Sequence, residues 1–364
     1  MYVIGPPYHA EHVGSLLRPR RLKNAFAAFQ AHEITPAELE ETIDDCVVEA
    51  VRLQEECGMR SITDGEFRRG SWFLGFVEAV DGLTTRPASL SFSGDHAAWS
   101  CPHAEGKVKR NQSIALHEFE FVKENTARMP KVTMPSPSAV HFLGAADKAG
   151  EGAYSDLDAL FEDLAVVYQQ EIEALDKAGC EFLQLDEVPL AMLCDPKVQE
   201  GVRAKGEDPD ALIGRYIDAI NMALKDRPED MTVGLHLCRG NYKGQWMAEG
   251  GYAPVAEKLF QEANVDAFFL EYDSERAGDF TPLAAVPEDK IVVLGLVSSK
   301  TPELEDPDDL KRRIEAASAH VSMDRLALSP QCGFASSVGG NPVTEDDERR
   351  KLTLVADVAA DVWS

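Results

Sequence analysis

Apolar residues recur along the chain at two spacings, and their alternation predicts the fold class. Thr35-Pro36-Ala37-Glu38 has the pattern of a helix-capping box, and Leu39, Ile43 and Val47 then follow at helical spacing until Gly58. The same helical spacing recurs over residues 155–179, 252–263, 307–319 and 344–363. Short apolar runs that indicate strands lie at 12–15, 60–64, 131–134, 182–185, 232–238, 267–272, 291–297 and 326–329.

Eight predicted strands alternating with helices favour an α/β fold of the (β/α)8 TIM-barrel type, with an open doubly wound sheet as the alternative. No glycine-rich phosphate loop follows the first strand, and polar residues gather after the C-terminal ends of the strands, where barrel active sites lie. Residues from about 75 to 128 break the alternation and are expected to form a small β-rich insertion of short strands and turns. Without an internal linker or repeat, residues 1–364 are expected to form one barrel domain.

Charge and composition narrow the class of partner. The 364 residues include 63 Asp and Glu against 36 Lys and Arg, and this net charge of −27 argues against nucleic acid or an anionic membrane surface as the partner. No run of about 18 apolar residues is present to span a bilayer. The N-terminus lacks the pattern of a signal peptide, and seven scattered cysteines suit a reducing compartment. A cytoplasmic location is therefore expected.

Four residues near strand ends form a candidate metal site. His236-Leu237-Cys238 places two good zinc ligands on one side of an extended strand, because strand side chains alternate. Glu271 closes the next apolar strand and Cys332 lies just beyond another, so all four are expected at one rim. An isolated His-x-Cys is more often a packing feature, but Glu271 and Cys332 at equivalent positions favour a metal. The five remaining cysteines show no such grouping and are better explained by packing: Cys46, Cys57, Cys101, Cys180 and Cys194.

Paired carboxylates follow two other predicted strands. Asp64-Gly65-Glu66 and Asp186-Glu187 together suggest recognition of an ammonium group, although each carboxylate could instead cap a helix. His12-Val13-Gly14-Ser15 offers backbone groups and a hydroxyl near the first strand. Basic residues that are candidate anchors for a substrate carboxylate, or alternatively solvated rim charges, are Arg18, Arg68 and Arg69.

Six motifs together resemble the catalytic barrel of cobalamin-independent methionine synthase. They are His12-Val-Gly-Ser-Leu-Leu-Arg-Pro19, Thr63-Asp-Gly-Glu66, Gln184-Leu-Asp-Glu187, His236-Leu-Cys238, Leu270-Glu271 and Gln331-Cys-Gly333, in the family's order across nearly the whole chain. The resemblance implies a barrel of the uroporphyrinogen decarboxylase and methionine synthase type, with Zn²⁺ held by His236, Cys238, Glu271 and Cys332. It also implies that Glu66 and Asp186 hold the amino group of a homocysteine-like substrate, while Gly14 and Ser15 contact its carboxylate.

The sequence departs from the family in two respects. The full-length family has a second, N-terminal barrel that helps to hold the folate donor, and this chain has room only for the catalytic barrel. The family's histidine that protonates the departing pterin aligns with Val297, so the usual proton donor is missing. Weak replacement candidates are His141, Tyr272 and Ser298, whereas a methylated corrinoid or a sulfonium donor would need no proton at nitrogen.

The resemblance implies a zinc-dependent methyltransferase of methionine biosynthesis, similar to 5-methyltetrahydropteroyltriglutamate–homocysteine S-methyltransferase. The alternatives are a zinc-dependent thiol–alkyl lyase or transferase acting on coenzyme M or glutathione, and a non-catalytic metal-binding barrel. The metal-free uroporphyrinogen decarboxylases are disfavoured, because a basic porphyrin cleft is hard to find in so acidic a chain. The expected partners are a small-molecule thiol and an alkyl donor, methyl-folate or another, with a homo-oligomer left open.

Overall fold

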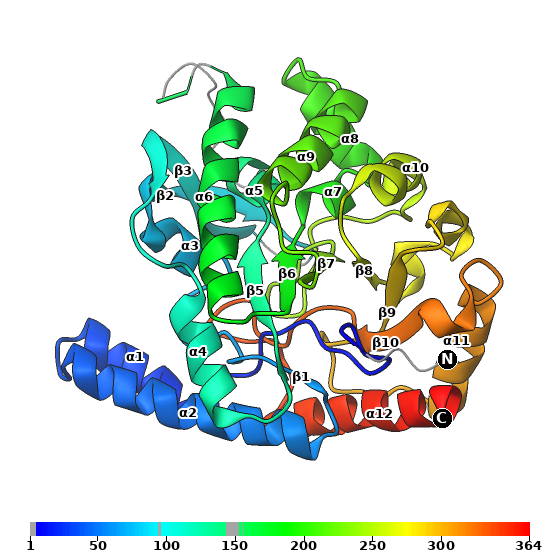
Figure 1. Cartoon of the computed structure of the whole chain (residues 1–364), viewed down its shortest axis with the longest axis horizontal. Coiled ribbons are helices and arrows are strands. Elements are labelled where there is room, and N and C mark those ends of the chain that lie inside the picture. The colour runs from blue at the N-terminus through cyan, green and yellow to red at the C-terminus, as the bar shows by residue number, and fades with distance from the viewer. Residues whose placement is uncertain (1–4, 94–95, 143–152, 155) are drawn as a thin grey trace.

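Six parallel strands form the central sheet of the computed structural model, which describes residues 5–93, 96–142, 153–154 and 156–364 (Figure 1). They are β5 (Val132–Pro135), β6 (Phe182–Asp186), β7 (Thr232–Leu237), β8 (Ala267–Glu271), β9 (Ile291–Val297) and β10 (Leu326–Pro330). Each strand pairs in parallel with the next in the order β10-β9-β8-β7-β6-β5. The six corresponding predicted strands are confirmed, because their bounds agree within about one residue.

Helices flank the sheet, and most of them follow a strand (Figure 1). The longer ones are α1 (Arg20–Gln30), α2 (Pro36–Glu56), α4 (Leu116–Asn125), α6 (Leu157–Lys177), α8 (Pro196–Ala204), α9 (Pro209–Ala223), α10 (Ala253–Glu262), α11 (Pro307–Ala317) and α12 (Glu345–Trp363). Short ones are α3 (Leu74–Ala79), α5 (Pro137–Val140), α7 (Pro189–Met192), η2 (Glu275–Ala277), η3 (Thr281–Ala285) and η4 (Met323–Arg325). Within the described part of the chain, none of these helices has both the length and the apolarity to cross a membrane.

Local sequence explains where several helices begin. The predicted capping box of α2 is confirmed, with the Glu38 N–H donating to Thr35 Oγ1 at 3.3 Å and the Glu38 carboxylate accepting from the Thr35 N–H. Two helices absent from the prediction, α8 and α9, each begin at an Asp-Pro pair. The side chains of Asp195 and Asp208 accept hydrogen bonds from N–H groups in the first turns of these helices. This pair of residues is a recognisable helix-start signal.

The predicted first strand at 12–15 is wrong. In this region only Ala10 forms a β-bridge, to Leu328 of β10. Gly14 then takes a φ of +137°, which an extended strand residue does not adopt. The strand predicted at 60–64 is present in shortened form as β1 (Ser61–Ile62), which pairs in parallel with β4 (Met129–Pro130), apart from the six-stranded sheet.

The region predicted as a β-rich insertion of short strands, residues 75–128, contains one long antiparallel hairpin between the helices α3 and α4. The hairpin consists of β2 (Val80–Ser91) and β3 (His96–Arg110), and residues 94 and 95 lie outside the described residues. The pairing passes Gly82 through a register shift between Asp81 and Leu83. A Cβ on Gly82 would lie 2.4 Å from the Lys107 carbonyl oxygen, so this close approach requires glycine.

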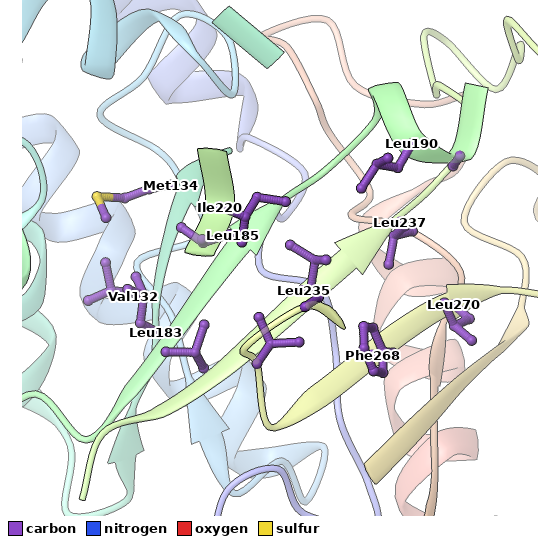
Figure 2. Close-up of a cluster of buried hydrophobic side chains, with 14 of the residues drawn as sticks. Val132, Met134, Leu183, Leu185, Leu190, Ile220, Leu235, Leu237, Phe268 and Leu270 are labelled. Atoms are coloured by element: carbon purple, nitrogen blue, oxygen red, sulfur yellow. The ribbon is translucent and has the colours of Figure 1, made fainter. Parts of the chain in front are cut away.

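The two faces of the sheet carry different side chains. Apolar residues such as Leu183, Leu235 and Phe268 form the main core towards the helices (Figure 2). The alternate residues face the opposite side, where Phe182 and Phe269 pack in a second small apolar cluster. Nearer the C-terminal strand ends, that same face carries polar side chains from β6, β7 and β8, and these build the candidate site.

Candidate metal centre and substrate pocket

Three of the four predicted metal ligands come together at the C-terminal strand ends. The ligand atoms of His236, Cys238 and Cys332 all lie within 4.8 Å of one another, and all three residues are buried. His236 and Cys238 share a face because they stand two positions apart at the end of β7. Cys332 follows β10, and its Sγ lies 3.8 Å from the Sγ of Cys238.

These residues fit a zinc ion. Two thiolates, each about 2.3 Å from a tetrahedral zinc ion, would lie about 3.8 Å apart, and this matches the observed sulfur separation of 3.8 Å. His236 Nδ1 lies 2.9 Å from Asp186 Oδ1, whereas its buried Nε2 has no hydrogen-bond partner in the described part of the chain. Metal-binding imidazoles are commonly oriented in this way, with a carboxylate on the nitrogen that does not bind the metal.

Without a metal ion, the buried cluster holds its protons tightly. The hydrogen bond with Cys332, together with burial, holds the pKa of Cys238 well above its usual range. Burial lowers the pKa of His236, but Cys238 and Asp186 outweigh it and raise that pKa to about 10. A metal ion would stabilise the thiolates and displace the proton from the imidazole, so metal binding is expected to release protons.

Glu271, the predicted fourth ligand, does not belong to the cluster found among the described residues. Its Oε2 accepts a hydrogen bond from the backbone N–H of Arg239 at 2.7 Å. Its Oε1 accepts from Arg276 Nη2 at 2.7 Å and from Lys300 Nζ at 3.0 Å. Burial alone would raise the pKa of Glu271, but Lys300, Arg276 and Arg239 keep it far below its usual range. Glu271 is therefore an anion within a buried ion-pair network.

Glu66 and Asp186, predicted to hold an ammonium group, line the same pocket as the metal cluster. Glu66 Oε1 accepts a hydrogen bond from Thr133 Oγ1 at 3.1 Å, whereas the buried Oε2 has no hydrogen-bond partner among the described residues. Burial, only partly offset by Arg69, raises the pKa of Glu66 to about 7. Glu66 also has a φ of +60°, a conformation that is rare outside glycine and frequent at functional sites.

The other carboxylate of each predicted pair has a local capping role. Asp64 Oδ1 accepts a hydrogen bond from the Glu66 N–H at 2.9 Å. Glu187 Oε1 accepts from the Leu190 N–H at the start of α7, also at 2.9 Å. The helix-cap alternative therefore describes Glu187, whereas Asp64 closes a turn at residues 65–68. Their partners Glu66 and Asp186 line the pocket.

Gly14 and Ser15 bring the N-terminal chain against the pocket. Ser15 lines it, and its carbonyl accepts a hydrogen bond from the Phe334 N–H at 2.9 Å. A Cβ on Gly14 would lie only 2.8 Å from Thr133 Cγ2, and a Cβ on Gly333 would lie 1.9 Å from Ser15 Oγ. Because glycine has no Cβ, Gly14 can lie against Thr133, and Gly333 can lie against Ser15 at the pocket wall.

The interpretation of three arginines as carboxylate anchors is wrong. The buried Arg18 guanidinium donates to the carbonyl groups of Ala335, Ser337, Glu66 and Arg69. Arg68 pairs with Glu40 and Asp44, and Arg69 pairs with Glu118. None of the three arginines belongs to the described pocket lining. Each arginine is close in sequence to a residue of the pocket, but its long side chain donates hydrogen bonds to acceptors on neighbouring segments of the chain.

The candidate proton donors also lie outside the lining of the described pocket. His141 Nδ1 lies 2.7 Å from Tyr216 Oη, and the Ser298 hydroxyl donates to Asp273 at 2.9 Å. Tyr272 is fully buried, with its ring against Tyr252 at a centroid distance of 5.4 Å. Val297 is buried at the end of β9.

The pocket has a volume of about 660 Å³, and its wall includes residues that sequence reasoning missed. They are Trp72, Phe92, Asn241, Tyr242 and Met247. Phe92, near the tip of the β2–β3 hairpin, lies beside Tyr242 with ring centroids 5.1 Å apart. The neighbouring Ser93 N–H donates to the Trp246 carbonyl at 2.7 Å. The sequence offers one signal for this part of the pocket wall: Trp72 and Tyr242 lie in loops that follow strands.

The cysteines outside the cluster behave as packing residues, as expected. Cys46, Cys57, Cys180 and Cys194 are buried and form no disulfide. Burial raises the pKa of Cys180 and of Cys194 to about 12. These thiols are poor nucleophiles at neutral pH.

Comparisons with known proteins show the family to which the chain belongs. The protein family described as the cobalamin-independent synthase catalytic domain matches residues 9–360. YxjH of Bacillus subtilis, described as uncharacterized, is 42% identical over 361 residues, covering 98% of this chain and 95% of YxjH. A candidate vitamin-B12-independent methionine synthase from Listeria monocytogenes is 35% identical, with a TM-score of 0.78 over 98% of each chain. A B12-independent methionine synthase from Shewanella sp. W3-18-1, in complex with selenomethionine, shares the fold, with a TM-score of 0.74, 18% identity and 97% coverage of each chain.

Proposed function

Because the chain belongs to the family of cobalamin-independent synthase catalytic domains, we propose that it is a zinc-dependent enzyme that transfers a methyl group to homocysteine. One observation carries the proposal. The cluster of His236, Cys238 and Cys332 shares a single pocket with the carboxylates of Glu66 and Asp186. A pocket with a metal site for sulfur and anions for an ammonium group suits a small amino acid that carries a thiol.

His236, Cys238 and Cys332 would hold the zinc ion, whose chemistry is to lower the pKa of a thiol and so favour the thiolate at neutral pH. Asp186 orients the site, because its Oδ1 lies 2.9 Å from His236 Nδ1. Gln184 Nε2 donates to the same oxygen at 2.8 Å and fixes the carboxylate in turn. This chain of contacts holds the imidazole in one orientation before any substrate arrives.

The amino acid portion of the substrate would be held by the other side of the pocket. Glu66 and Asp186 both line the pocket. Glu66 Oε2 accepts no hydrogen bond from the described residues and lies 4.0 Å from Arg69 Nη1, so an ammonium group in the pocket would find carboxylate oxygens to accept its hydrogen bonds. Ser15 and Gly333 form the adjoining wall and are suited to contact the substrate carboxylate. The selenomethionine complex of the Shewanella relative supports an amino acid of this kind as ligand. The methyl donor would be a methyl-folate or another alkyl donor.

We also propose that residues 1–364 form a single domain in which the sheet closes as a (β/α)8 barrel. The Glu11 N–H donates to the Leu328 carbonyl of β10 at 2.9 Å, and the Leu16 N–H donates to the Gly65 carbonyl at 3.1 Å. The β1–β4 pair then leads to β5, at the other edge of the six-stranded sheet. These contacts support a ring in which residues 9–16 take the place of the first strand.

The cysteines support a cytoplasmic location. All seven are free thiols, and the two nearest to each other belong to the metal cluster. Free cysteines in this number suit a reducing compartment.

A zinc-dependent lyase or transferase acting on another thiol, such as coenzyme M or glutathione, is the second candidate. One observation favours it: the candidate donors His141, Tyr272 and Ser298 do not line the described pocket. A methyl-folate needs a proton on its leaving nitrogen, whereas an alkyl group that departs from sulfur does not.

Metal analysis combined with an assay of thiol and donor pairs tests the proposal. We expect about one zinc ion per chain in the wild type, and loss of most of it in Cys238→Ser and Cys332→Ser. Cys180→Ser, at a buried thiol outside the cluster, is the matched control and should keep its zinc. Homocysteine, coenzyme M and glutathione are each tested with methyltetrahydrofolate, methylcobalamin and a sulfonium donor. Full zinc occupancy in both site variants would refute the metal centre, and turnover of coenzyme M or glutathione but not homocysteine would favour the second candidate.

A further inference from the structure

Arg69 and Glu118 form a largely buried ion pair beside the carboxylate of Glu66. Arg69 follows the turn at residues 65–68, and Glu118 lies on α4. The pair is bidentate, because Arg69 Nη2 donates to Glu118 Oε2 at 2.7 Å and Arg69 Nε donates to Glu118 Oε1 at 3.2 Å. The two side chains are only 6% and 12% exposed. Water therefore screens this pair weakly, and its two parallel hydrogen bonds fix the direction of the guanidinium.

The hydroxyl of Thr133 bridges Arg69 and Glu66. Thr133 Oγ1 accepts a hydrogen bond from Arg69 Nη1 at 3.0 Å and donates to Glu66 Oε1 at 3.1 Å. The direct separation between Arg69 Nη1 and Glu66 Oε2 is 4.0 Å, which is beyond hydrogen-bond distance. The charge of Arg69 is thus paired with Glu118, while Glu66 Oε2 accepts no hydrogen bond from the described residues.

Other charged groups around Glu66 have their own partners or lie on neighbouring segments. Besides burial, the groups that act electrostatically on Glu66 are Arg69, Asp186, Asp64, Arg18 and Lys131. Lys131 pairs with Glu11 at 3.3 Å, and the Arg18 guanidinium donates to backbone carbonyl groups. Among the described ion pairs, Arg69 is the cation that lies within 4.0 Å of the Glu66 carboxylate. The state of Arg69 therefore decides how much of the Glu66 charge remains for a ligand.

We propose that Glu118 is a positioning residue that keeps the Arg69 guanidinium off Glu66, so that the Glu66 carboxylate stays available to the ammonium group of the substrate. The inference rests on the proposed function and deepens it. Neither Arg69 nor Glu118 belongs to the described pocket lining. Without the charge of Glu118, the buried Arg69 would have Glu66 as its nearest counter-ion. A shift of about 1 Å would then give a direct salt bridge to the oxygen that the ligand uses.

Glu118→Gln should weaken methionine binding and move its pH dependence. A cation that is freed to act on a carboxyl group 4–6 Å away lowers the pKa of that group by about 1–3. The midpoint of the pH dependence, expected near 7 from the pKa of Glu66, should therefore fall to about 6 or below. A proton and an ammonium group bind the same carboxylate, so the Kd of methionine at pH 8 should rise by about tenfold. Between pH 6 and 8 this Kd should change by no more than about twofold, because Glu66 is then at least half ionised at pH 6.

Removing both members of the ion pair should restore binding. The double variant Arg69→Met/Glu118→Gln has the same net charge beside Glu66 as the wild type, and a neutral pair can replace a buried ion pair at little cost. Its Kd at pH 8 should return to within roughly threefold of the wild-type value, with the midpoint again near 7. If Glu118 acted through packing alone, the double variant would bind methionine no better than Glu118→Gln. Glu120→Gln, at an exposed position on the same helix, is the matched control and should leave the Kd and the midpoint unchanged.

Isothermal titration calorimetry of methionine into the zinc-loaded, full-length protein makes these measurements, with urea denaturation as the check that each variant is folded. An unchanged Kd and pH profile in Glu118→Gln, or a double variant as weak as the single one, overturns the inference. If Glu118→Gln does not fold, the double variant decides, because a midpoint well below 7 in that protein would overturn the inference equally. A wild type that binds no methionine between pH 6 and 8 would instead refute the proposed function itself.

Discussion

The raised pKa of Glu66 predicts that the affinity for amino acid ligands depends on pH. Burial, only partly offset by Arg69, raises this pKa to about 7, and Glu66 lines the pocket. Only the ionised carboxylate can balance the charge of a ligand ammonium group. Since a carboxyl group is neutral below its pKa, binding should weaken as the pH falls through 7. Methionine is the suitable ligand for this measurement. Its thioether has no proton to lose, so the pH dependence of its binding does not include the ionisation of a thiol at the metal.

The size of the effect follows from the titration of one group. With a pKa of about 7, Glu66 is about nine-tenths ionised at pH 8 and about one-tenth ionised at pH 6. If only the ionised form binds, the Kd of methionine should rise about tenfold across these two pH units, or about 1.4 kcal/mol. In Glu66→Gln the side chain keeps its shape without titrating. Its Kd should match or exceed the wild-type value at pH 6 and should vary little with pH.

Isothermal titration calorimetry of the zinc-loaded protein, at half-unit steps from pH 6 to 8, makes the measurement. Glu348→Gln is the matched control: burial raises the pKa of Glu348 to about 8, yet this residue lies on α12 and outside the pocket lining. The control should keep the wild-type pH profile. A flat profile in the wild type, or the same slope surviving in Glu66→Gln, would refute the assignment of Glu66 to the ammonium group.

Three further predictions concern positioning and stability. Gln184→Leu removes the amide that fixes the Asp186 carboxylate at 2.8 Å, so zinc affinity should fall by about 10- to 100-fold, as chelator competition would show. In urea denaturation, the free energy of unfolding of Glu348→Gln should increase relative to that of the wild type as the pH rises from about 4.5 to 8. The reason is that folding raises the pKa of Glu348 in the wild type, so the wild-type protein loses stability through that pH window. A constant difference between the two proteins would contradict this. Gly14→Ala should lower the free energy of unfolding by about 1–3 kcal/mol, since the φ is +137° and the new Cβ would lie 2.8 Å from Thr133 Cγ2; an unchanged urea midpoint would contradict it.

Much of the fold could be predicted because a buried parallel strand shows as a continuous apolar run. β8 and β9 meet that condition, and each of the other four strands is mostly apolar but contains a polar residue: Thr133, Gln184, His236 and Ser329. The N-terminal segment failed because the short motif around Gly14 resembles a strand in composition, while its backbone turns at the glycine. The β2–β3 hairpin was predicted as several short strands, whereas its pairing continues on both sides of the register shift at Gly82.

The site could be predicted where strand periodicity decides the direction of a side chain. His236 and Cys238 stand two residues apart, so an extended chain must place them together, and Cys332 follows a strand of the same sheet. Periodicity says nothing about loops that fold over the site. Phe92 and Tyr242 meet because a hairpin and a strand-end loop, about 150 residues apart, pack against each other.

The contacts of Glu271 could not be predicted from its position at the end of a strand. Its place at the end of β8 sets the direction in which its carboxylate leaves the backbone, but not which long side chains reach that carboxylate. Arg239, Arg276 and Lys300 follow three different strands, and each alone reads as an ordinary solvated cation. Only their convergence on one buried carboxylate gives Glu271 its role.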